Sequence, residues 1–317
     1  MTRQEIGILL LLLVLCAIVA VASPQFLSVV NLQNVGRLAG TYGIFSIGVG
    51  FVIITGGIDL SVGSICALLG VLLSMMLVEW HWPPALALGA VVALGGALGA
   101  VHGVLIARLG LQPFIVTLCG LLLYRGAARY IADDSTKGFG TGEGFEWVRA
   151  LASGSLGGVP MPFVVMCIVA AMAWVLLHRS VYGRHLFAVG HNAEAARYSG
   201  VGTRTVVAWA YVLSGVLTAL SAVIIAFYTN SISPASHDNF YELYAIAAAV
   251  VGGCSLRGGE GTVLGIVIGA TLLQVLRNLV NLLDIPGSLD FAVMGAVILI
   301  GAMADQLFGR RMRRAAT

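Results

Sequence analysis

The chain has 317 residues, of which 59% are hydrophobic and only 10% are charged. Soluble globular domains carry about 25% charged residues, so 17 basic and 14 acidic side chains are too few to cover a water-exposed surface. The composition excludes a soluble domain and indicates an integral membrane protein. We interpret the net charge of +3 as a signal of membrane orientation and not of nucleic-acid binding.

Ten long apolar segments follow one another along the chain. A membrane-spanning helix needs about 20 mostly apolar residues, whereas the strands of a membrane barrel alternate over shorter segments. The continuous segments therefore predict an all-α polytopic fold of about ten transmembrane helices, with residues 1–317 forming a single domain. The predicted spans are 6–22, 38–54, 60–78, 85–107, 113–132, 159–177, 205–228, 241–254, 262–283 and 288–308.

The first segment also has features of a cleavable secretion signal, because Arg3 precedes an apolar core and Ala-Val-Ala stands at 20–22. The apolar run of 17 residues is longer than a typical signal core, and it begins a chain with many further spans. We expect this segment to be retained as the first helix.

The second predicted span runs into FVIITGGIDLSVG, residues 51–63, where an aspartate has no lysine or arginine nearby. Gly56 and Gly57 interrupt the helix, and irregular backbone at membrane depth is tolerated only inside protein or beside water. A new helical run follows Asp59. Its carboxylate is therefore expected to accept hydrogen bonds from the amides of residues 61 and 62, at the positive end of the helix dipole.

The fourth span carries a face of small residues, which favours close helix packing. Packing within the chain is the default expectation, and a dimer seam is the alternative. His102 in the same span is expected to be a hydrogen-bonded interior residue. The glycines of this face are Gly95, Gly96, Gly99 and Gly103.

Arg125 and Arg129 are one turn apart near the outer end of the fifth span. We expect them to extend toward the membrane surface or to pair with Asp133 or Asp134. The following connection, 133–158, is rich in glycine and serine, and its FEWVRAL stretch predicts a short helix. It is either a plain surface loop or a docking surface for an external partner.

The connection 178–204 is the longest arginine-rich loop. Within it, NAEAARYSG predicts a short helix, with Asn192 as N-cap and Gly200 at the C-terminal end. A short helix of small residues is suited to lie in the groove of a partner protein. An ordinary amphipathic connector is the alternative.

A glycine-rich stretch, 252–261, follows the eighth predicted span. As at Gly56 and Gly57, a short apolar segment meets a glycine pair before another helix begins. Paired interrupted segments in two halves of a chain point to a transport site, although these glycines are also compatible with a re-entrant hairpin. Arg277 and Asn278 lie near the end of the ninth span.

Positive charge also concentrates in the tail RRMRR at 310–314. Short arginine-rich loops remain in the cytoplasm. With ten spans, a cytoplasmic loop at 178–204 places both termini in the cytoplasm. The loop 133–158, with its acidic stretch 133–146, and the acidic connection 237–242 are then expected outside.

Motifs of enzymes are missing from the sequence. A phosphate-binding loop of the form G-x-x-x-x-G-K-[ST] requires a lysine, and the chain's one lysine, Lys137, lies in DDSTKGFG. The sequence has no H-E-x-x-H, C-x-x-C or G-x-S-x-G motif, and its five cysteines lack paired spacing. We therefore predict a protein that is not an enzyme and holds neither metal nor cofactor itself.

Three ordered motifs carry a family resemblance: TGGIDLSVGS, GHNAEAARYSGV and AAAVVGGCSLRGGEGTVLG. They resemble the permease subunits of bacterial ATP-binding-cassette (ABC) importers for monosaccharides, the ribose, xylose and galactose group, over about residues 20–305. The resemblance implies inward sugar transport across the bacterial inner membrane. It also implies a separate ATPase subunit that binds ATP and Mg, a periplasmic sugar-binding protein and a second permease copy.

In that family a G-N-x-x-A-A-R-x-S-G-I stretch contacts the ATPase. This chain departs from it at His191, where glycine is usual, and at Val201, where isoleucine is usual. The implied coupling residues are Gly190, Asn192, Glu194, Ala195, Ala196, Arg197, Ser199 and Gly200. The expected residues of the translocation pathway or gate are Thr55, Gly56, Gly57, Asp59, Ser61, Gly252, Gly253 and Ser255.

The role of Asp59 separates the possible functions. We favour a structural cap and gate element, because a capping aspartate needs no cationic partner, and direct sugar contact and a proton relay are the alternatives. A proton relay would make the chain a self-sufficient secondary sugar transporter. An intramembrane enzyme has no catalytic pair at usable spacing.

Overall fold

The computed structural model describes residues 3–140 and 144–284 continuously, together with residues 289, 292, 295, 296 and 299. Nearly all regular structure in this part of the chain is helical. Eight of its helices are long and apolar enough to cross a membrane. An all-α polytopic membrane protein is thereby confirmed. The predicted tenth span, 288–308, lies outside the continuously described residues.

The elements occur in the following order. The first half forms α1 (Arg3–Ala22), the short η1 (Pro24–Leu27), α2 (Val29–Ile54), α3 (Val62–Ser74) with its continuation η2 (Met75–Glu79), α4 (Pro84–Ala107), α5 (Pro113–Ile131), β1 (Lys137–Gly138) and α6 (Glu146–Ser153). The second half forms β2 (Ser155–Leu156), β3 (Val159–Pro160), α7 (Met161–Trp174) with η3 (Val175–Arg179), α8 (Val181–His191), α9 (Ala193–Tyr198), α10 (Thr203–Thr229), β4 (Ser231–Ile232), α11 (Tyr241–Val251) and α12 (Val263–Leu282).

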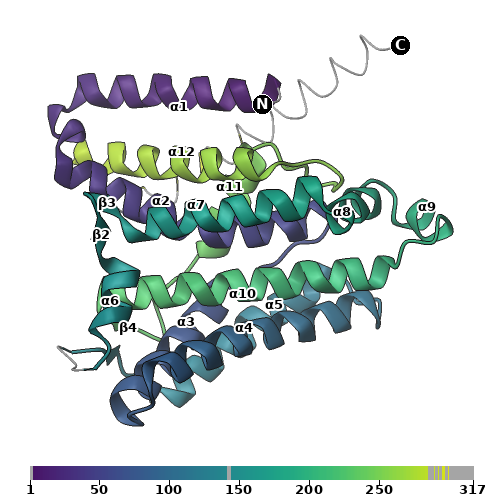
Figure 1. Cartoon of the computed structure of the whole chain (residues 1–317), viewed down its shortest axis with the longest axis horizontal. Coiled ribbons are helices and arrows are strands. Elements are labelled where there is room, and N and C mark those ends of the chain that lie inside the picture. Colours follow the sequence, from purple (N-terminus) through teal and green to yellow (C-terminus); the bar gives the residue numbers. More distant parts are fainter. Residues whose placement is uncertain are drawn as a thin grey trace.

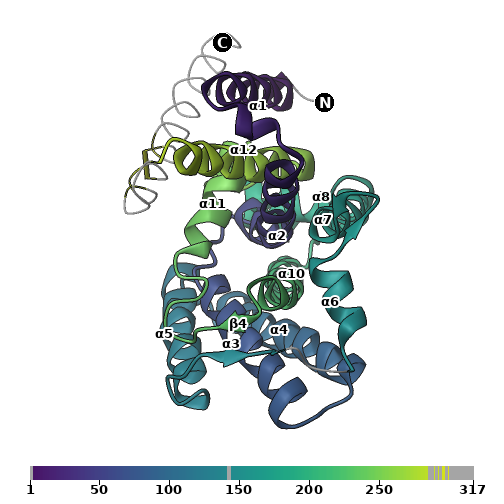
Figure 2. The same cartoon turned by 90° about the vertical axis from the view of Figure 1, so that its left-hand side faces the viewer.

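Two long helices, α2 and α10, form the centre of the bundle (Figure 2). Helix α10 packs against α2, α3 and α4, while α2 also contacts α7, α11 and α12. Helix α1 lies outermost and packs against α12 (Figure 1). The central α2 and α3 are mostly buried, whereas α1, α4, α5 and α7 expose much of their apolar surface. Such faces fit lipid or other membrane subunits.

The predicted glycine face of α4 packs within the chain, against α10. A Cβ on Gly95 would lie 2.6 Å from the carbonyl oxygen of Gly215, and one on Gly103 would lie 2.8 Å from the Cα of Ala208. A Cβ on Gly99 would overlap the backbone of Tyr211. The two helix backbones therefore approach too closely for any side chain at these positions.

The elements α6 and the two small strand pairs gather at one end of the helices, opposite to α9 (Figure 1). Strand β1 pairs with β4, and β2 pairs with β3. The predicted short helix in FEWVRAL is confirmed as α6. We call this end the outer end, following the predicted orientation.

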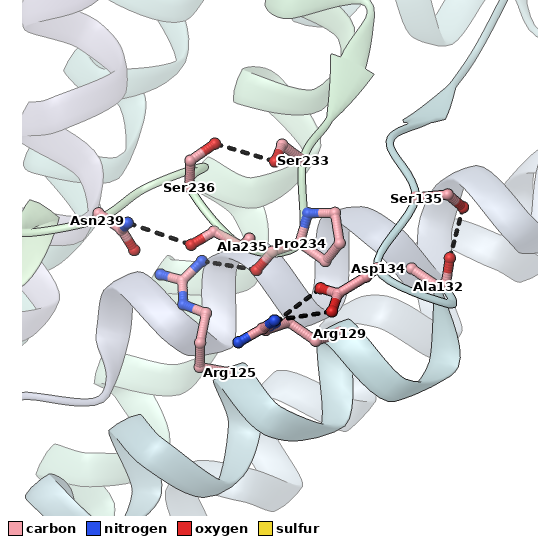
Figure 3. A network of polar contacts seen from close by, with 10 residues as sticks. All are labelled: Arg125, Arg129, Ala132, Asp134, Ser135, Ser233, Pro234, Ala235, Ser236 and Asn239. Atoms are coloured by element: carbon pink, nitrogen blue, oxygen red, sulfur yellow. Dashed lines mark hydrogen bonds and ion pairs between the residues drawn. The ribbon is translucent and has the colours of Figure 1, made fainter.

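The two arginines of α5 have different partners (Figure 3). Arg129 forms the predicted ion pair, because its Nε and Nη2 donate to the two carboxylate oxygens of Asp134 at 2.7 Å each. The pairing predicted for Arg125 is wrong. Its Nη1 donates to the carbonyl oxygens of Pro234 at 3.2 Å and His237 at 2.6 Å, because the 233–239 segment passes beside this side chain.

The predicted eighth span, 241–254, is also wrong as a full membrane span. Helix α11 has 11 residues, about 16 Å at 1.5 Å per residue, and Gly252 ends it. The glycine-rich stretch after it forms turns that lead into α12. The predicted ninth span is confirmed as α12.

We expect Gly99→Val to lower stability, because the added side chain would force α4 away from α10. Overpacking of this kind costs about 1–3 kcal/mol. Thermal unfolding of the detergent-solubilised protein, followed by size-exclusion chromatography after heating, measures the change. Gly89→Val is the matched control on the same helix, since a Cβ there meets nothing within 4 Å. Equal stability of the two variants would contradict the close α4–α10 contact.

Candidate functional site

Helix α9 protrudes from the end of the molecule opposite to α6 (Figure 1). Asn192 begins it as predicted, because its Oδ1 accepts a hydrogen bond from the amide of Ala195 at 2.9 Å. Gly200 follows the helix with a φ of +84°, a conformation that glycine adopts without steric cost. The departure at His191 does not disturb the cap. The six-residue helix is thus defined at both ends by local sequence.

Most side chains of α9 are exposed, and Ala196 alone among its six residues is buried. Tyr198 is 77% exposed, and the guanidinium of Arg197 lies 5.5 Å from the centre of its ring. The Ser199 hydroxyl donates to the carbonyl of Ala195 at 3.0 Å. A rigid exposed helix with an aromatic anchor and a cation is suited to helix-in-groove binding by a partner protein.

Four glycines, from the end of α8 and from two loops, meet just behind α9, and we call them the glycine junction: Gly56, Gly190, Gly258 and Gly259. The amide of Gly259 donates to the carbonyl oxygen of Ile54, the last residue of α2, at 2.9 Å. A Cβ on Gly258 would lie 2.8 Å from both the carbonyl oxygen of Gly190 and the amide nitrogen of Gly56. A Cβ on Gly190 would overlap the backbone of Ile54 and Gly259.

The glycine junction joins the two sets of residues that the sequence assigned to coupling and to the pathway or gate. Gly190 precedes α9 by three residues, Gly56 lies in the break between α2 and α3, and Gly258 lies between α11 and α12. Backbone touches backbone at this point, without side chains that would allow sliding. The end of α8 and both breaks are therefore packed against one another at interior density.

Asp59 lies in the break between α2 and α3 and is 2% exposed. Its Oδ1 accepts from the amide of Ser61 at 3.0 Å and from the Ser61 hydroxyl at 2.6 Å. Its Oδ2 accepts from the hydroxyl of Ser214 in α10 at 3.0 Å. The predicted bond from the amide of residue 61 is confirmed. The structure shows no bond to Asp59 from the amide of residue 62, because Ser61 and not Asp59 occupies the N-cap position of α3.

A chain of hydrogen bonds extends from Asp59 through Ser61 and His102 to Tyr124. His102 Nδ1 lies 3.4 Å from the Ser61 hydroxyl, and its Nε2 lies 2.9 Å from the hydroxyl of Tyr124. One neutral tautomer satisfies every member: Tyr124 donates to Nε2, Nδ1–H donates to Ser61, and Ser61 donates to Asp59. The prediction that His102 is a hydrogen-bonded interior residue is confirmed. We call these residues, with Ser214, the Asp59 network.

The backbone of the break is satisfied by neighbouring helices. The carbonyl oxygen of Ile58 accepts from the Tyr211 hydroxyl of α10 at 3.2 Å and from the Thr117 hydroxyl of α5 at 3.4 Å. Thr55 ends α2, and its hydroxyl donates to the carbonyl of Val52 at 2.7 Å. Irregular backbone at this position is therefore enclosed by protein. Two neighbouring helices, α5 and α10, thus hold the backbone of the break.

The residues predicted around the second break have packing and turn roles. A Cβ on Gly252 would overlap the backbone of Gly265, so this glycine brings α11 against α12. Gly253 has a φ of +95°. The Ser255 hydroxyl accepts from the amide of Arg257 at 3.3 Å. These contacts keep the second break rigid where it meets the first.

Sequence reasoning missed Ser214 and Tyr211, the two α10 residues that hold the first break. Both are buried polar positions in a span that is otherwise mainly apolar. A hydroxyl at membrane depth signals an interior hydrogen bond. The sequence does not show, however, that the partner of Ser214 is Asp59, which lies 155 residues away.

Comparison with known proteins gives a family and several relatives. The model of the family described as branched-chain amino acid transport system / permease component matches residues 31–302. The ribose import permease protein of Haemophilus influenzae is 37% identical over 300 residues, 95% of this chain and 92% of that protein. The ribose import permease protein of Bacillus subtilis is 38% identical over 304 residues, covering 96% and 93%. The D-allose transport system permease protein of Escherichia coli is 33% identical over 309 residues, covering 97% and 93%. No solved structure shows a significant match.

We expect Asp59→Ala to destabilise the protein by about 1–3 kcal/mol, because the amide and hydroxyl of Ser61 and the hydroxyl of Ser214 lose their buried acceptor. Asp59→Asn is the control, since its carbonyl oxygen still accepts a hydrogen bond. Thermal unfolding in detergent is the measurement. If the alanine variant were as stable as the asparagine variant, these hydrogen bonds would not hold the break.

Proposed function

The chain belongs to the family of permease components of the branched-chain amino acid transport system type, and on this premise we propose that it carries a monosaccharide of the ribose class. The family model takes its description from amino acid permeases, but relatives that match nearly the whole chain are permeases for ribose, D-allose and xylose. The chain is therefore a sugar import permease subunit, a multi-pass protein of the bacterial inner membrane and not an enzyme. The identity of the sugar, with ribose as the first candidate, is the proposal.

The observation that supports the mechanism is the contact that the end of α8, directly before the exposed helix α9, makes with both helix breaks at the glycine junction. A permease without a phosphate-binding loop needs an energy source in another subunit. Helix α9 is the exposed element that presents an aromatic anchor to such a subunit, an ABC ATPase that binds ATP and Mg. The coupling residues are the eight named from the family motif, with Arg197 and Tyr198 on the outer surface.

Transport follows from a two-position movement of α9. When the ATPase domains close, α9 and the end of α8 move as one piece because the cap at Asn192 and the close packing at Gly190 keep them rigid. The glycine junction passes this displacement to Gly56 and Gly258, hence to α3 and α11. A neutral sugar needs hydrogen-bond partners along its path but no counter-charge.

The remaining parts of the assembly are proposed from the same family membership. A periplasmic sugar-binding protein delivers the sugar to the outer end, near α6 and the strand pairs. Two copies of the permease enclose the path, and both termini and α9 lie in the cytoplasm. The arginines of 178–204 support this orientation, since they surround α9.

A proton-coupled secondary transporter that uses Asp59 is the weaker alternative. The comparisons favour the importer, since the near-full-length relatives are import permeases of the same family. The geometry agrees, because both oxygens of Asp59 accept hydrogen bonds from serines in a buried network. Asp59 is best explained as the element that stabilises the break.

We expect Tyr198→Ala to weaken binding of the ATPase about tenfold or more, as for aromatic anchors at the centre of interfaces. Co-purification of the ATPase with the tagged permease, titrated with salt, is the measurement. Tyr130→Ala is the matched control, because Tyr130 is 84% exposed at the outer end. Equal loss in both variants, or none in either, would contradict ATPase docking at α9.

We expect Gly190→Ala to retain the ATPase but to reduce sugar uptake about tenfold, because the added methyl group separates the α8 end from Ile54 and Gly259 at a cost of about 1–3 kcal/mol. Uptake of labelled D-ribose into proteoliposomes and ATP hydrolysis are measured on the same preparation. Gly202→Ala is the control on the other side of α9, since a Cβ there lies 3.9 Å from its nearest neighbour. Normal uptake by Gly190→Ala would show that the glycine junction does not transmit the movement.

A further inference from the structure

The segment between β4 and α11 runs along α3, away from the outer end and toward the middle of the helix bundle. Ile232 packs where Gly70 leaves space, and the carbonyl of Asp238 and a carboxylate oxygen of Glu242 each lie 2.5 Å from the place of a Cβ on Gly63. Gly63 is the second residue of α3, about 24 Å along the helix from Glu79 at 1.5 Å per residue. Asp238 and Glu242 are therefore acidic residues at membrane depth, and the prediction that the connection 237–242 lies outside is wrong, because this segment packs beside Gly63.

Both acids are buried, and Asp238 lacks the partner that a structural ion pair would supply. Asp238 is 3% exposed, and neither of its carboxylate oxygens has a partner at good hydrogen-bond geometry among the residues that the structure describes. The thiol of the buried Cys66, a weak donor, lies beside it. The nearby guanidinium of Arg125 instead donates to the carbonyl of Pro234 (Figure 3). It also donates to the carbonyl of His237. Ionisable residues inside a membrane domain are costly, and they mark substrate pathways when no structural pairing explains them.

An aromatic wall stands beside the two acids. Tyr42 and Phe45 of α2 meet Tyr241 of α11, with ring centres 4.8 Å apart for Tyr42 and Tyr241 and 6.0 Å apart for the stacked pair Phe45 and Tyr241. Arg277 of α12 donates from Nη1 to the Tyr42 hydroxyl at 3.0 Å. Tyr241 is only partly buried, so one side of this wall is open to its surroundings.

We propose that Asp238, Glu242, Tyr42 and Tyr241 form a sugar-contacting site inside the membrane domain, which we call the α11 site. This inference rests on the proposed function and deepens it. Unpartnered carboxylate oxygens accept hydrogen bonds from sugar hydroxyls, and aromatic faces pack against the apolar C–H face of a sugar ring. A neutral polyol is the ligand that uses both features together.

The same residues disfavour a metal cation at the α11 site. The guanidinium groups of Arg125 and Arg277 flank the site, and their positive charge opposes a bound cation. Among the described residues, no group of three His, Cys, Asp or Glu side chains is placed to hold a metal ion. A proton on Asp238 is the remaining competitor, and the experiment distinguishes it.

Helix α11 joins the α11 site to the glycine junction, next to the helix α9 that is proposed to bind the ATPase. Asp238 and Phe240 have φ angles of +59° and +66°, left-handed conformations that are rare for residues with side chains and are often found at functional sites. They stand directly before the 11-residue helix α11, and the chain after its other end carries Gly258 and Gly259. A movement at the glycine junction thus reaches the α11 site through one short rigid helix.

The test uses the permease reconstituted in proteoliposomes with its ATPase and its periplasmic binding protein. D-ribose, D-allose and D-xylose are supplied as labelled probes, and the one that the wild type imports is used. Asp238→Asn is expected to lower the maximal import rate at least tenfold without changing the amount of ATPase bound. Asp133→Asn is the matched control: it is an exposed aspartate with a similar φ of +51°.

A second readout does not depend on energy coupling or on the folding of Asp238→Asn. In a permease with the exposed Cys119 and Cys167 replaced by serine, Phe240→Cys places a thiol beside the α11 site. The transported sugar is expected to slow alkylation of this thiol at least threefold, and an equal concentration of sodium chloride is not.

The outcomes separate the two proposals. If the wild type binds no ATPase and imports none of the three sugars, the proposed function fails and the α11 site fails with it. If the wild type imports a sugar, equal import by Asp238→Asn and Asp133→Asn would overturn the α11 site alone. If the sugar leaves the alkylation rate of the Phe240→Cys thiol unchanged, the α11 site is also overturned. Import that persists in Asp238→Asn but loses its dependence on pH would assign Asp238 to proton binding and would also overturn the site.

Discussion

Every backbone amide and carbonyl inside the membrane must find a partner within the protein, and the break between α2 and α3 is where this requirement is most demanding. The chain leaves the helix at Ile54 and resumes it at Val62. The groups freed in between bond to three other parts of the fold: Ile58 to α10 and α5, and Ile54 to the loop before α12. The arrangement of the surrounding helices follows from these bonds.

Asp59 makes the break possible without a cation. Its two oxygens take three hydrogen bonds from Ser61 and Ser214, and Ser61 continues to His102 and Tyr124. Each group in this network is buried, and each has a donor or acceptor role that the next group complements. A fully satisfied network of this kind rigidifies its surroundings. The stiffness suits a break that transmits movement without unfolding.

Close backbone contacts at glycines limit how far neighbouring segments can slide past one another. Where α4 meets α10, and where Gly190 meets Gly258, backbones touch directly and side chains are absent from the contact. Such contacts leave little freedom for small sliding movements, so attached segments move together. The exposed helix α9, the two breaks and α11 therefore form one connected series of contacts from the end that carries α9 to the acids at membrane depth.

The sequence by itself determined the features that depend on composition or on near neighbours. Long apolar segments gave the membrane class, the cap at Asn192 and the glycine at 200 gave α9, and the spacing of Asp59 and Ser61 gave their hydrogen bond. Each of these is set within a few residues of chain. Only the tertiary structure decided that Ser214 bonds to Asp59, that Gly190 meets Ile54 and Gly258, that Arg125 donates to carbonyls and not to an aspartate, and that the eighth span shortens to α11. These contacts join residues that are tens to more than one hundred positions apart, and in a chain where many helices are similarly apolar the pattern of one segment does not specify which other segment packs against it.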